Sequence, residues 1–297
     1  MMSFTQIYDK FRQRKTTNFN KATKEDIRYC YRLFLNREPD EEGYDFYKGL
    51  IKQSNITTQY LVNSFLNGAE FKSIQDKLKT PTLVEMPKFD MYVRMNDMFI
   101  GAAIYHTHTY EPHVAHQIEA LLKPGMTFVD AGANIGFFTM LAASLVQEEG
   151  QVFAFEPNPD NCELIRKSIE KNQFNNVHVY QNALAEAKQT FDFSVDISNG
   201  RLLHESHTNN ELVNYEVQAI TLDETLADLS QLDVIKMDIE GAEPRAWQGM
   251  VETIKKHRPI VIFEFAPSAI QLTSQVKPEE FLTTIQQNYD LFILQDS

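Results

Sequence analysis

The segment Phe128–Gly136, with the sequence FVDAGANIG, joins a β-rich run to a helix-like run, and this junction decides the fold. Its first residues are typical of a strand end that carries Asp130. Gly132 and Gly136 can take positive φ and let the backbone approach a ligand closely. A helix that begins at Gly136 also presents unpaired backbone amides. The segment therefore predicts a strand, a glycine turn and a helix N-terminus that together can bind a ligand.

Downstream of residue 125, short β-rich runs alternate with amphipathic stretches. This alternation is typical of repeated βαβ units, and it predicts an α/β fold with a mostly parallel sheet. The predicted strands are 127–131, 151–155, 177–181, 234–238 and 260–265, with a further one at 289–296. The predicted helices lie near 136–147, 159–172 and 244–257.

Upstream, between residues 24 and 79, the apolar spacing is helical and predicts three or four short helices. The proline-containing run LKTPTLVEMP at 78–87 ends this pattern. Residues 89–105 then alternate around the turn candidate Asn96-Asp97, which predicts a hairpin. We therefore expect three parts: a small all-helical domain at 1–80, a linker and lead-in hairpin at 81–109, and an α/β domain at 110–297.

Charge and composition exclude several classes of protein. The 28 basic and 41 acidic residues give a formal net charge of −13, which opposes binding to nucleic acid and to anionic membranes. Cys30 and Cys162 supply neither a disulfide framework nor a zinc spacing. The first 28 residues hold no signal-peptide core, and polar residues interrupt the apolar stretch 129–146, so no transmembrane segment is predicted. We expect a cytoplasmic protein, with the oligomeric state left open.

A carboxylate twenty residues beyond Gly136 suggests the kind of ligand. Glu156 follows the next predicted strand, where it can accept hydrogen bonds from both ribose hydroxyls of a nucleoside. The Gly-x-Asn-x-Gly spacing differs from that of dinucleotide sites, and Asp130 would place negative charge close to a pyrophosphate. A cationic nucleoside is favoured, and S-adenosylmethionine has the ribose, an ammonium and a sulfonium.

Five motifs in order resemble the FkbM-type methyltransferases: VDAGANIGFFTMLAA, AFEPNP, TLDETL, DVIKMDIEGAE and RPIVIFEF. The resemblance runs from about Tyr110 to Phe265. It implies the class I methyltransferase (Rossmann-like) fold and methylation of a hydroxyl oxygen. It also implies cofactor-binding roles, in which Asp130, Gly132, Asn134 and Gly136 surround the methionine half, Glu156 holds the ribose and Asn182 lies near the adenine.

Proton removal from an alcohol calls for a base, and parallel sheets place ligands at the carboxyl ends of their strands. The candidate catalytic residues there are Asp238, Glu240 and Glu264, and Asp238 also borders the cofactor. An aspartate and a glutamate on neighbouring strands could hold magnesium, but a metal is not favoured.

Six histidines are candidates for metal ligands or bases. No period places three of the group His106, His108, His113 and His116 on one face with a carboxylate, so a solvated or lid position is favoured over a metal site. His204 and His207 lie in the polar insertion SNGRLLHESHTNN, which the resemblance places near the acceptor. His204 is a reserve candidate for the base.

The helical region resembles the small module related to phycobilisome linker domains, found beside glycan-modifying enzymes and in bacterial surface proteins. Arg37, Asp40 and Gly43 match its Arg-x-x-Asp-x-x-Gly signature within YRLFLNREPDEEGYDFYKGLI. We expect this motif to brace a helix-helix turn. The two resemblances together predict a small-molecule or glycan acceptor.

The sequence thus predicts an S-adenosylmethionine-dependent O-methyltransferase acting on a hydroxyl of a sugar, glycan or related small molecule. A noncatalytic scaffold with a methyltransferase fold and a nicotinamide-dependent oxidoreductase are the alternatives. The resemblance also implies a sheet that ends with a sixth strand and an antiparallel seventh. Because only 289–296 remains as a candidate strand, we expect the seventh strand to be missing and the chain to be C-terminally shortened.

Overall fold

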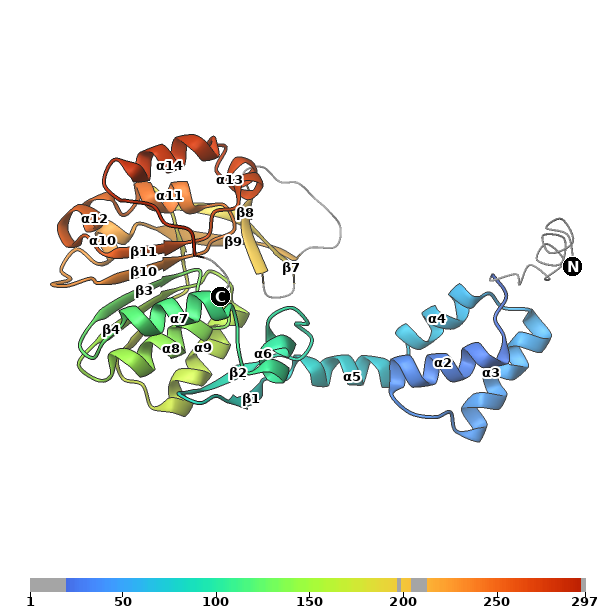
Figure 1. Ribbon diagram of the computed structural model, residues 1–297. Helices are drawn as coiled ribbons and strands as arrows, with labels where there is room; N and C mark the ends of the chain where they lie inside the picture. Colours follow the sequence, from blue (N-terminus) through green and yellow to red (C-terminus); the bar gives the residue numbers. More distant parts are fainter. Residues whose placement is uncertain (1–19, 197–198, 204–212, 295–297) are drawn as a thin grey trace, which may run out of the picture. The chain divides into compact units, whose positions relative to one another are not determined.

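The chain divides between Lys79 and Thr80 into two compact units, each with a core of its own (Figure 1). The computed structural model describes residues 20–196, 199–203 and 213–294. The predicted all-helical region at the N-terminal side of an α/β unit is confirmed. Within the described residues, no helix is long and apolar enough to cross a membrane.

The helical unit contains α2 Lys24–Leu35, α3 Glu41–Ser54, α4 Thr58–Leu66 and α5 Ala69–Lys79. Thr23 and Asp26 begin α2 with reciprocal side-chain to backbone hydrogen bonds, as a capping box does. Ile27 and Leu61 are fully buried, and Phe65 packs edge-on against Tyr31. Short helices are marginal in isolation, so this shared core holds α2, α3 and α4 together.

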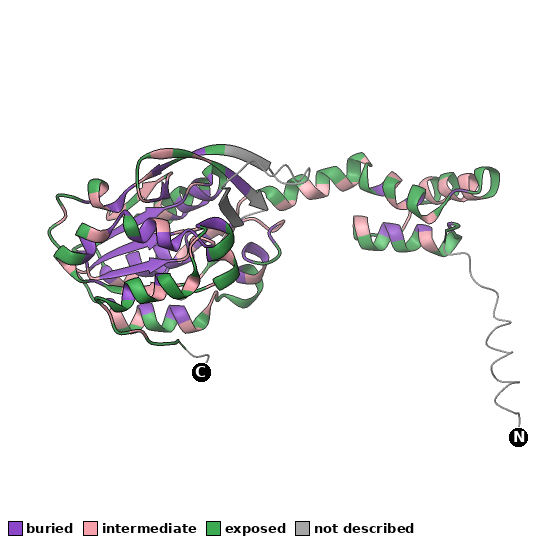
Figure 2. Ribbon diagram, turned by 90° about the horizontal axis from the view of Figure 1, so that it is seen from above, coloured by how far each residue is buried: buried purple, intermediate pink, exposed green. Residues whose placement is uncertain are grey.

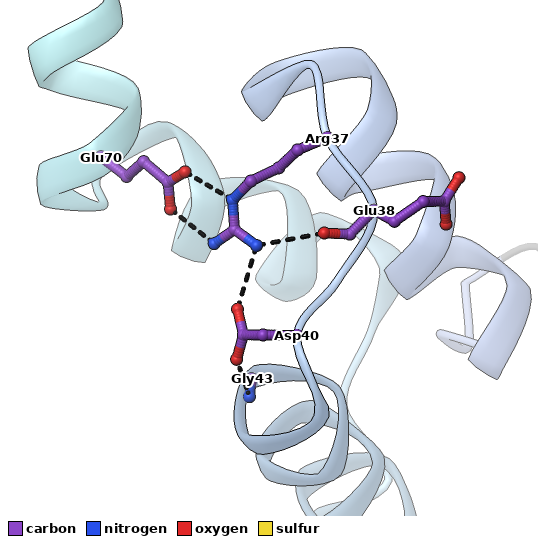
Figure 3. Close-up of polar contacts among 5 residues, drawn as sticks. All are labelled: Arg37, Glu38, Asp40, Gly43 and Glu70. Atoms are coloured by element: carbon purple, nitrogen blue, oxygen red, sulfur yellow. Dashed lines mark hydrogen bonds and ion pairs between the residues drawn. The ribbon is translucent and has the colours of Figure 1, made fainter.

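Arg37 joins the α2–α3 connection to α5 (Figure 3). Its Nε and Nη2 donate to the two carboxylate oxygens of Glu70 at 2.7 and 2.8 Å. Its Nη1 donates to Asp40 at 3.0 Å and to the Glu38 carbonyl at 3.1 Å. The other oxygen of Asp40 accepts from the Gly43 amide and so caps α3. The Arg-x-x-Asp-x-x-Gly motif therefore has the expected structural role at a helix-helix turn.

The α/β unit is built on a five-stranded, wholly parallel sheet in the order β11-β10-β3-β4-β5. Its strands are β3 Thr127–Ala131, β4 Gln151–Phe155, β5 Val177–Tyr180, β10 Val234–Met237 and β11 Ile260–Phe263. From β3 the chain adds β4 and β5 on one side and later adds β10 and β11 on the other, as in a doubly wound sheet. The α/β, class I methyltransferase fold predicted from sequence is confirmed.

Helices cover both faces of this sheet (Figure 1). One face carries α7 Pro112–Leu121, α8 Phe137–Val146 and α9 Pro159–Asn172. The other carries α10 Leu222–Thr225, α11 Glu243–Gln248, α12 Val251–His257, α13 Pro267–Thr273 and α14 Pro278–Gln286. Because both faces are covered, β3 and β10 are buried along their whole length (Figure 2).

A second sheet, in the order β6-β9-β7-β8, was not predicted. It consists of β6 Ala183–Leu184, β7 Gln189–Asp196, β8 Asn199–Leu203 and β9 Val213–Ile220. The stretch interpreted as a polar insertion, 198–210, contains β8, and no strand was assigned to 189–196, although Phe191 and Phe193 alternate with polar residues there, as strand residues do. His204 and His207 lie outside the described residues.

The lead-in hairpin occurs earlier than predicted. Strand β1 Thr82–Glu85 pairs with β2 Asp90–Val93, so the turn lies between them and not at Asn96-Asp97. Asp97 instead accepts from the amides of Phe99 and Ile100, just before α6 Gly101–Thr107. The side-chain bonds that make aspartate common in turns also make it common ahead of helices.

The strand predicted at 289–296 is wrong over its described part, because residues 289–294 form neither strand nor helix. Phe292 and Ile293 are 87% and 88% exposed. An apolar run becomes a strand only where a neighbouring strand pairs with it, and none of the described strands pairs with this one. Strand β11 is therefore an edge of the five-stranded sheet.

Gly43 tests the packing of the helical unit. A Cβ at this position would collide with Oη of Tyr31, whose ring is buried beneath the Arg37 guanidinium. We expect Gly43→Ala to destabilise the unit by about 1 kcal/mol, although alanine usually favours a helix. Hydrogen exchange of the α2 and α3 amides in the full chain would measure this.

The matched control is Gly49→Ala in the same helix, where a Cβ would meet no atom within 4 Å. This variant should gain about 0.5–1 kcal/mol from helix propensity. Equal effects of the two substitutions would contradict the packing argument.

Candidate functional site

A cavity lies at the carboxyl ends of the five parallel strands. The hydrogen-bond ladder continues one residue past the strands, because Glu264 N donates to Met237 O and Asp238 N to Ala131 O. On the other side, Gly132 N donates to Phe155 O and Glu156 N to Tyr180 O. The ladder thus brings four residues to the cavity in one row: Glu264, Asp238, Gly132 and Glu156.

The two glycines of the FVDAGANIG segment are required by close packing as well as by conformation. Gly132 has φ 81°, and a Cβ there would collide with the carbonyl oxygen of Asp238. Gly136 has φ 90°, and its Cβ would come within 2.8 Å of the Ile165 side chain. Helix α8 begins immediately afterwards, at Phe137. The predicted strand, glycine turn and helix N-terminus are confirmed.

Glu156 is a buried carboxylate that organises the turn. Its Oε2 accepts from the Asn134 amide and its Oε1 from the Asn158 amide, both at 2.8 Å. Burial raises the pKa of Glu156 to about 8, and the backbone hydrogen bonds oppose this only in part. Its Oε1 also accepts, at 3.5 Å, from the side-chain amide of Asn161. A carboxylate has about four acceptor positions, so Glu156 retains some capacity to accept from a ligand in the cavity.

The end of β10 carries a lysine that the sequence analysis missed. Lys236 is 5% exposed, lines the cavity, and donates to Oδ2 of Asp238 at 3.2 Å. Burial alone would lower the pKa of this lysine, but the charges of Asp238, Asp130 and Glu111 outweigh it and raise the pKa. Its place in VIKMD, inside an apolar strand, was the available signal, because a lysine is rarely buried unless it is paired.

Glu264 follows β11 and forms a side-chain hydrogen bond with Asp238. Part of its surface is exposed at the cavity. Burial of the remainder, and then the charges of Asp238, Glu240 and Glu243, raise the pKa of Glu264 to about 7. At neutral pH this carboxyl can therefore both accept and release a proton.

The loop after β10 is held by Glu243. Its Oε1 accepts from the Ile239 amide at 2.9 Å and more weakly from the Gly241 amide at 3.4 Å. Glu240 takes a left-handed conformation, with φ 56°, and lines the cavity. Glutamate rarely adopts such a conformation, and residues held there cluster at functional sites.

Glu111 is a second residue that the sequence analysis missed. It precedes Pro112 with φ 39°, accepts a hydrogen bond from the Tyr110 hydroxyl, and lines the cavity with it. Burial, followed by the charge of Asp238, raises the pKa of Glu111. Nothing in the sequence marked this glutamate, since it lies outside the glycine turn and the strand ends.

Most of the sequence-predicted site residues line this one cavity: Gly132, Asn134, Glu156, Asn182, Asp238, Glu240 and Glu264. Asp130 and Gly136 are not among the lining residues. Asp130 is fully buried, and its Oδ2 accepts from the Thr139 hydroxyl at 2.6 Å. Its other oxygen, Oδ1, is buried without a hydrogen-bond partner in the described structure.

The histidine group expected to be solvated is largely so. His106, His108 and His116 are exposed, and His113 is half-buried. Across the part of the chain that the structure describes, no three histidine, cysteine, aspartate or glutamate side chains are grouped so that they could hold a metal ion. The candidate site is therefore a set of carboxylates around one lysine.

Two relatives of known name match parts of the chain. A probable cobalt-precorrin-6B C(15)-methyltransferase (decarboxylating) from Sulfurisphaera tokodaii is 37% identical over 78 residues, which are 26% of this chain and 41% of that protein. The chain thus spans less than half of the length of that relative. Methyltransferase sdnD from Sordaria araneosa is 25% identical over 230 residues, covering 65% of this chain and 85% of that protein.

Among solved structures, methyltransferase FkbM from Methylobacillus flagellatus KT superposes with a TM-score of 0.37 and 17% identity, covering 82% of this chain and 65% of that one. Residues 6–74 match a domain of unknown function, DUF4214, which leaves the likeness to phycobilisome linkers unconfirmed. Residues 130–289, more than half of the chain, match the Methyltransferase FkbM domain. The protein belongs to the FkbM methyltransferase family.

Proposed function

We propose that the protein transfers a methyl group from S-adenosylmethionine to a hydroxyl of a sugar, glycan or related small molecule. The proposal rests on the row Glu264, Asp238, Gly132 and Glu156. In this row Glu156, our candidate for the ribose, lies on one side of the glycine turn, and Asp238 and Glu264 lie on the other. Family membership supports the methyltransferase activity. The choice of an oxygen acceptor and of a glycan rests on the resemblances found in the sequence.

The order of the strands supports a separate binding position for each part of the cofactor. Asn182 follows β5, Glu156 follows β4, and the glycine turn follows β3. In our proposal, these positions hold the adenine, the ribose and the methionine half in turn. Asp238, beyond the turn, then faces the positively charged end of the cofactor.

The charge of the cavity suits a cationic cofactor. Five carboxylates line it: Glu111, Glu156, Asp238, Glu240 and Glu264. Among the described lining residues, Lys236 alone has a positively charged side chain, and it is already paired with Asp238. A sulfonium and an ammonium gain Coulomb energy in such surroundings, whereas a pyrophosphate would be repelled.

Glu264 is our candidate for the base that accepts the hydroxyl proton, with Asp238 and Glu240 as the neighbouring candidates. S-adenosylmethionine supplies the electrophilic methyl group when it is bound. The chain aligns the acceptor oxygen with that methyl group, keeps water away and takes the proton. We assign proton removal to these carboxylates because Glu264, with a pKa raised to about 7, lines the cavity.

We also infer that the protein resides in a reducing, cytoplasmic compartment. Cys30 and Cys162 are both buried free thiols, and burial raises their pKa values to about 11 and about 12. Thiols of this kind are unreactive and contribute no disulfide. Fractionation of the host cell would test the inference.

Glu156 should control binding of the nucleoside half. Glu156→Ala is expected to weaken binding of 5′-methylthioadenosine, which has the ribose but no amino acid, at least about tenfold in calorimetry. Wild-type affinity should rise as pH increases toward 8 and then level off, because the ribose hydroxyls donate to the ionised carboxylate, whose pKa is about 8. The variant should lose this pH dependence.

Glu170→Ala, at an exposed position on α9, is the matched control and should bind as the wild type does. Melting temperatures need to be compared as well, since Glu156→Ala also frees the Asn134 and Asn158 amides. An unchanged, pH-independent affinity for methylthioadenosine would disprove the ribose assignment. Preferential binding of a nicotinamide dinucleotide would favour an oxidoreductase.

Glu264→Gln should reduce methyl transfer without abolishing cofactor binding. We expect kcat to fall about a hundredfold with radiolabelled S-adenosylmethionine and a panel of neutral oligosaccharides. The wild-type rate should rise as pH increases through about 7, because the base acts in its ionised form. Full activity of the variant on a wild-type substrate would exclude Glu264 as the base.

The helical unit should be dispensable for cofactor binding. Among the residues that the structure describes, none before Ile100 lines the cavity, and we propose that residues 80–297 fold as an independent methyltransferase domain. A chain that begins at Thr80 is expected to bind S-adenosylhomocysteine as tightly as the full chain does. A folded truncation that no longer binds would show that the division is wrong.

A further inference from the structure

Lys236 has an apolar neighbour on one side within the sheet and an acidic neighbour on the other. On β11 its register partner is Ile262, and on β3 it is Asp130. Nζ also lies 5.1 Å from the centre of the Phe138 ring on α8. Of these neighbours, only Asp130 carries a charge that can offset a buried ammonium.

Asp130 is fixed in turn by α8. The Thr139 hydroxyl holds its Oδ2 at 2.6 Å, while its Oδ1 is fully buried and has no hydrogen-bond partner in the described structure. Burial raises the pKa of Asp130, and the positive charge of Lys236 opposes that effect in part.

Toward the cavity, Lys236 contacts the carboxylate of Asp238, whose side chain is 23% exposed. Glu111, ahead of α7, also acts on the lysine. Asp238 itself lies close to Glu264 after β11 and to Glu240 and Glu243 after β10. The lysine is therefore placed to compensate negative charge both beneath the cavity and at its surface.

We propose that Asp130, Lys236 and Asp238 form a charge relay, in which Lys236 is a positioning residue that holds the Asp238 carboxylate turned toward the cavity. Asp130 would then affect the cofactor through Lys236 and not by direct contact, which fits its absence from the cavity wall. This inference rests on the proposed binding of S-adenosylmethionine.

The relay predicts different effects on the two halves of the cofactor. Without Lys236, the Asp238 carboxylate loses the cation that holds it in place, so it should attract the ammonium of the cofactor less. Glu156 lies at the end of the residue row opposite to Glu264. The backbone amides that donate to it belong to its own loop and to the glycine turn. Nucleoside binding should therefore persist.

The test uses calorimetry between pH 6 and 9 on the full chain. S-adenosylhomocysteine reports on the amino-acid half, and 5′-methylthioadenosine, which lacks that half, reports on the nucleoside. The main variant is Asp130→Asn/Lys236→Met, because removing both charges avoids leaving Asp130 buried without its cation. Lys236→Arg retains the charge, and Lys255→Met, at an exposed lysine paired with Glu252, is the matched control.

The double variant should lose S-adenosylhomocysteine affinity about tenfold across this pH range. Methylthioadenosine affinity should stay at the wild-type value. Lys236→Arg and Lys255→Met should retain the wild-type pH profile. In an Asp238→Asn background, the same double substitution should have little further effect, because the lysine acts through Asp238.

Three results would overturn the relay: unchanged S-adenosylhomocysteine affinity in the double variant, equal losses for both ligands, or a full further loss in the Asp238→Asn background. Should the double variant fail to fold, a Lys236→Arg protein with an altered pH profile would also refute it. If the wild type binds neither ligand, the proposed function itself is wrong.

Discussion

The parallel pairing of β3 with β10 on one side and with β4 on the other is the constraint on which the candidate site depends. Ala131 is the register partner of both Met237 and Phe155, so the residues after these three emerge at one level. An acidic residue, a glycine and another acidic residue then share one cavity. The same pairing sets Asp130 beside Lys236, so the sheet builds both the cavity surface and the charges beneath it.

Acidic side chains are concentrated at this site, and hydrogen bonds and one buried cation stabilise them. Backbone amides hold Glu156 and Glu243, a hydroxyl holds Asp130, and a buried lysine holds Asp238. Burial nevertheless raises the pKa values of Glu156, Glu243 and Glu264. Carboxyl groups with raised pKa values cluster at functional sites. Their ionised form can gain its stabilisation from a bound ligand. A cationic cofactor would supply that stabilisation.

Predictions from the sequence succeeded where the local residue pattern is enough to determine the structure that forms. The five parallel strands are apolar runs of the right length, and the glycine turn needs small residues for steric reasons. These predictions failed where a partner decides the outcome. The segment at 289–294 is apolar enough for a strand but has no strand to pair with in the described structure. By contrast, β8 lies in the stretch interpreted as a polar insertion and is a strand because it pairs with β7.

By itself, the sequence determined the α/β fold, the glycine turn and the carboxylates at the strand ends, since these follow from residue spacing along single strands and loops. Only the tertiary structure decided that Lys236 and Glu111 belong to the site and that Asp130 lies beneath it. Their positions depend on cross-strand register and on the left-handed turn before α7. The physical reason is that hydrophobic periodicity shows which face of a helix or strand is buried, but it does not show which charged side chains of other elements lie beside that face.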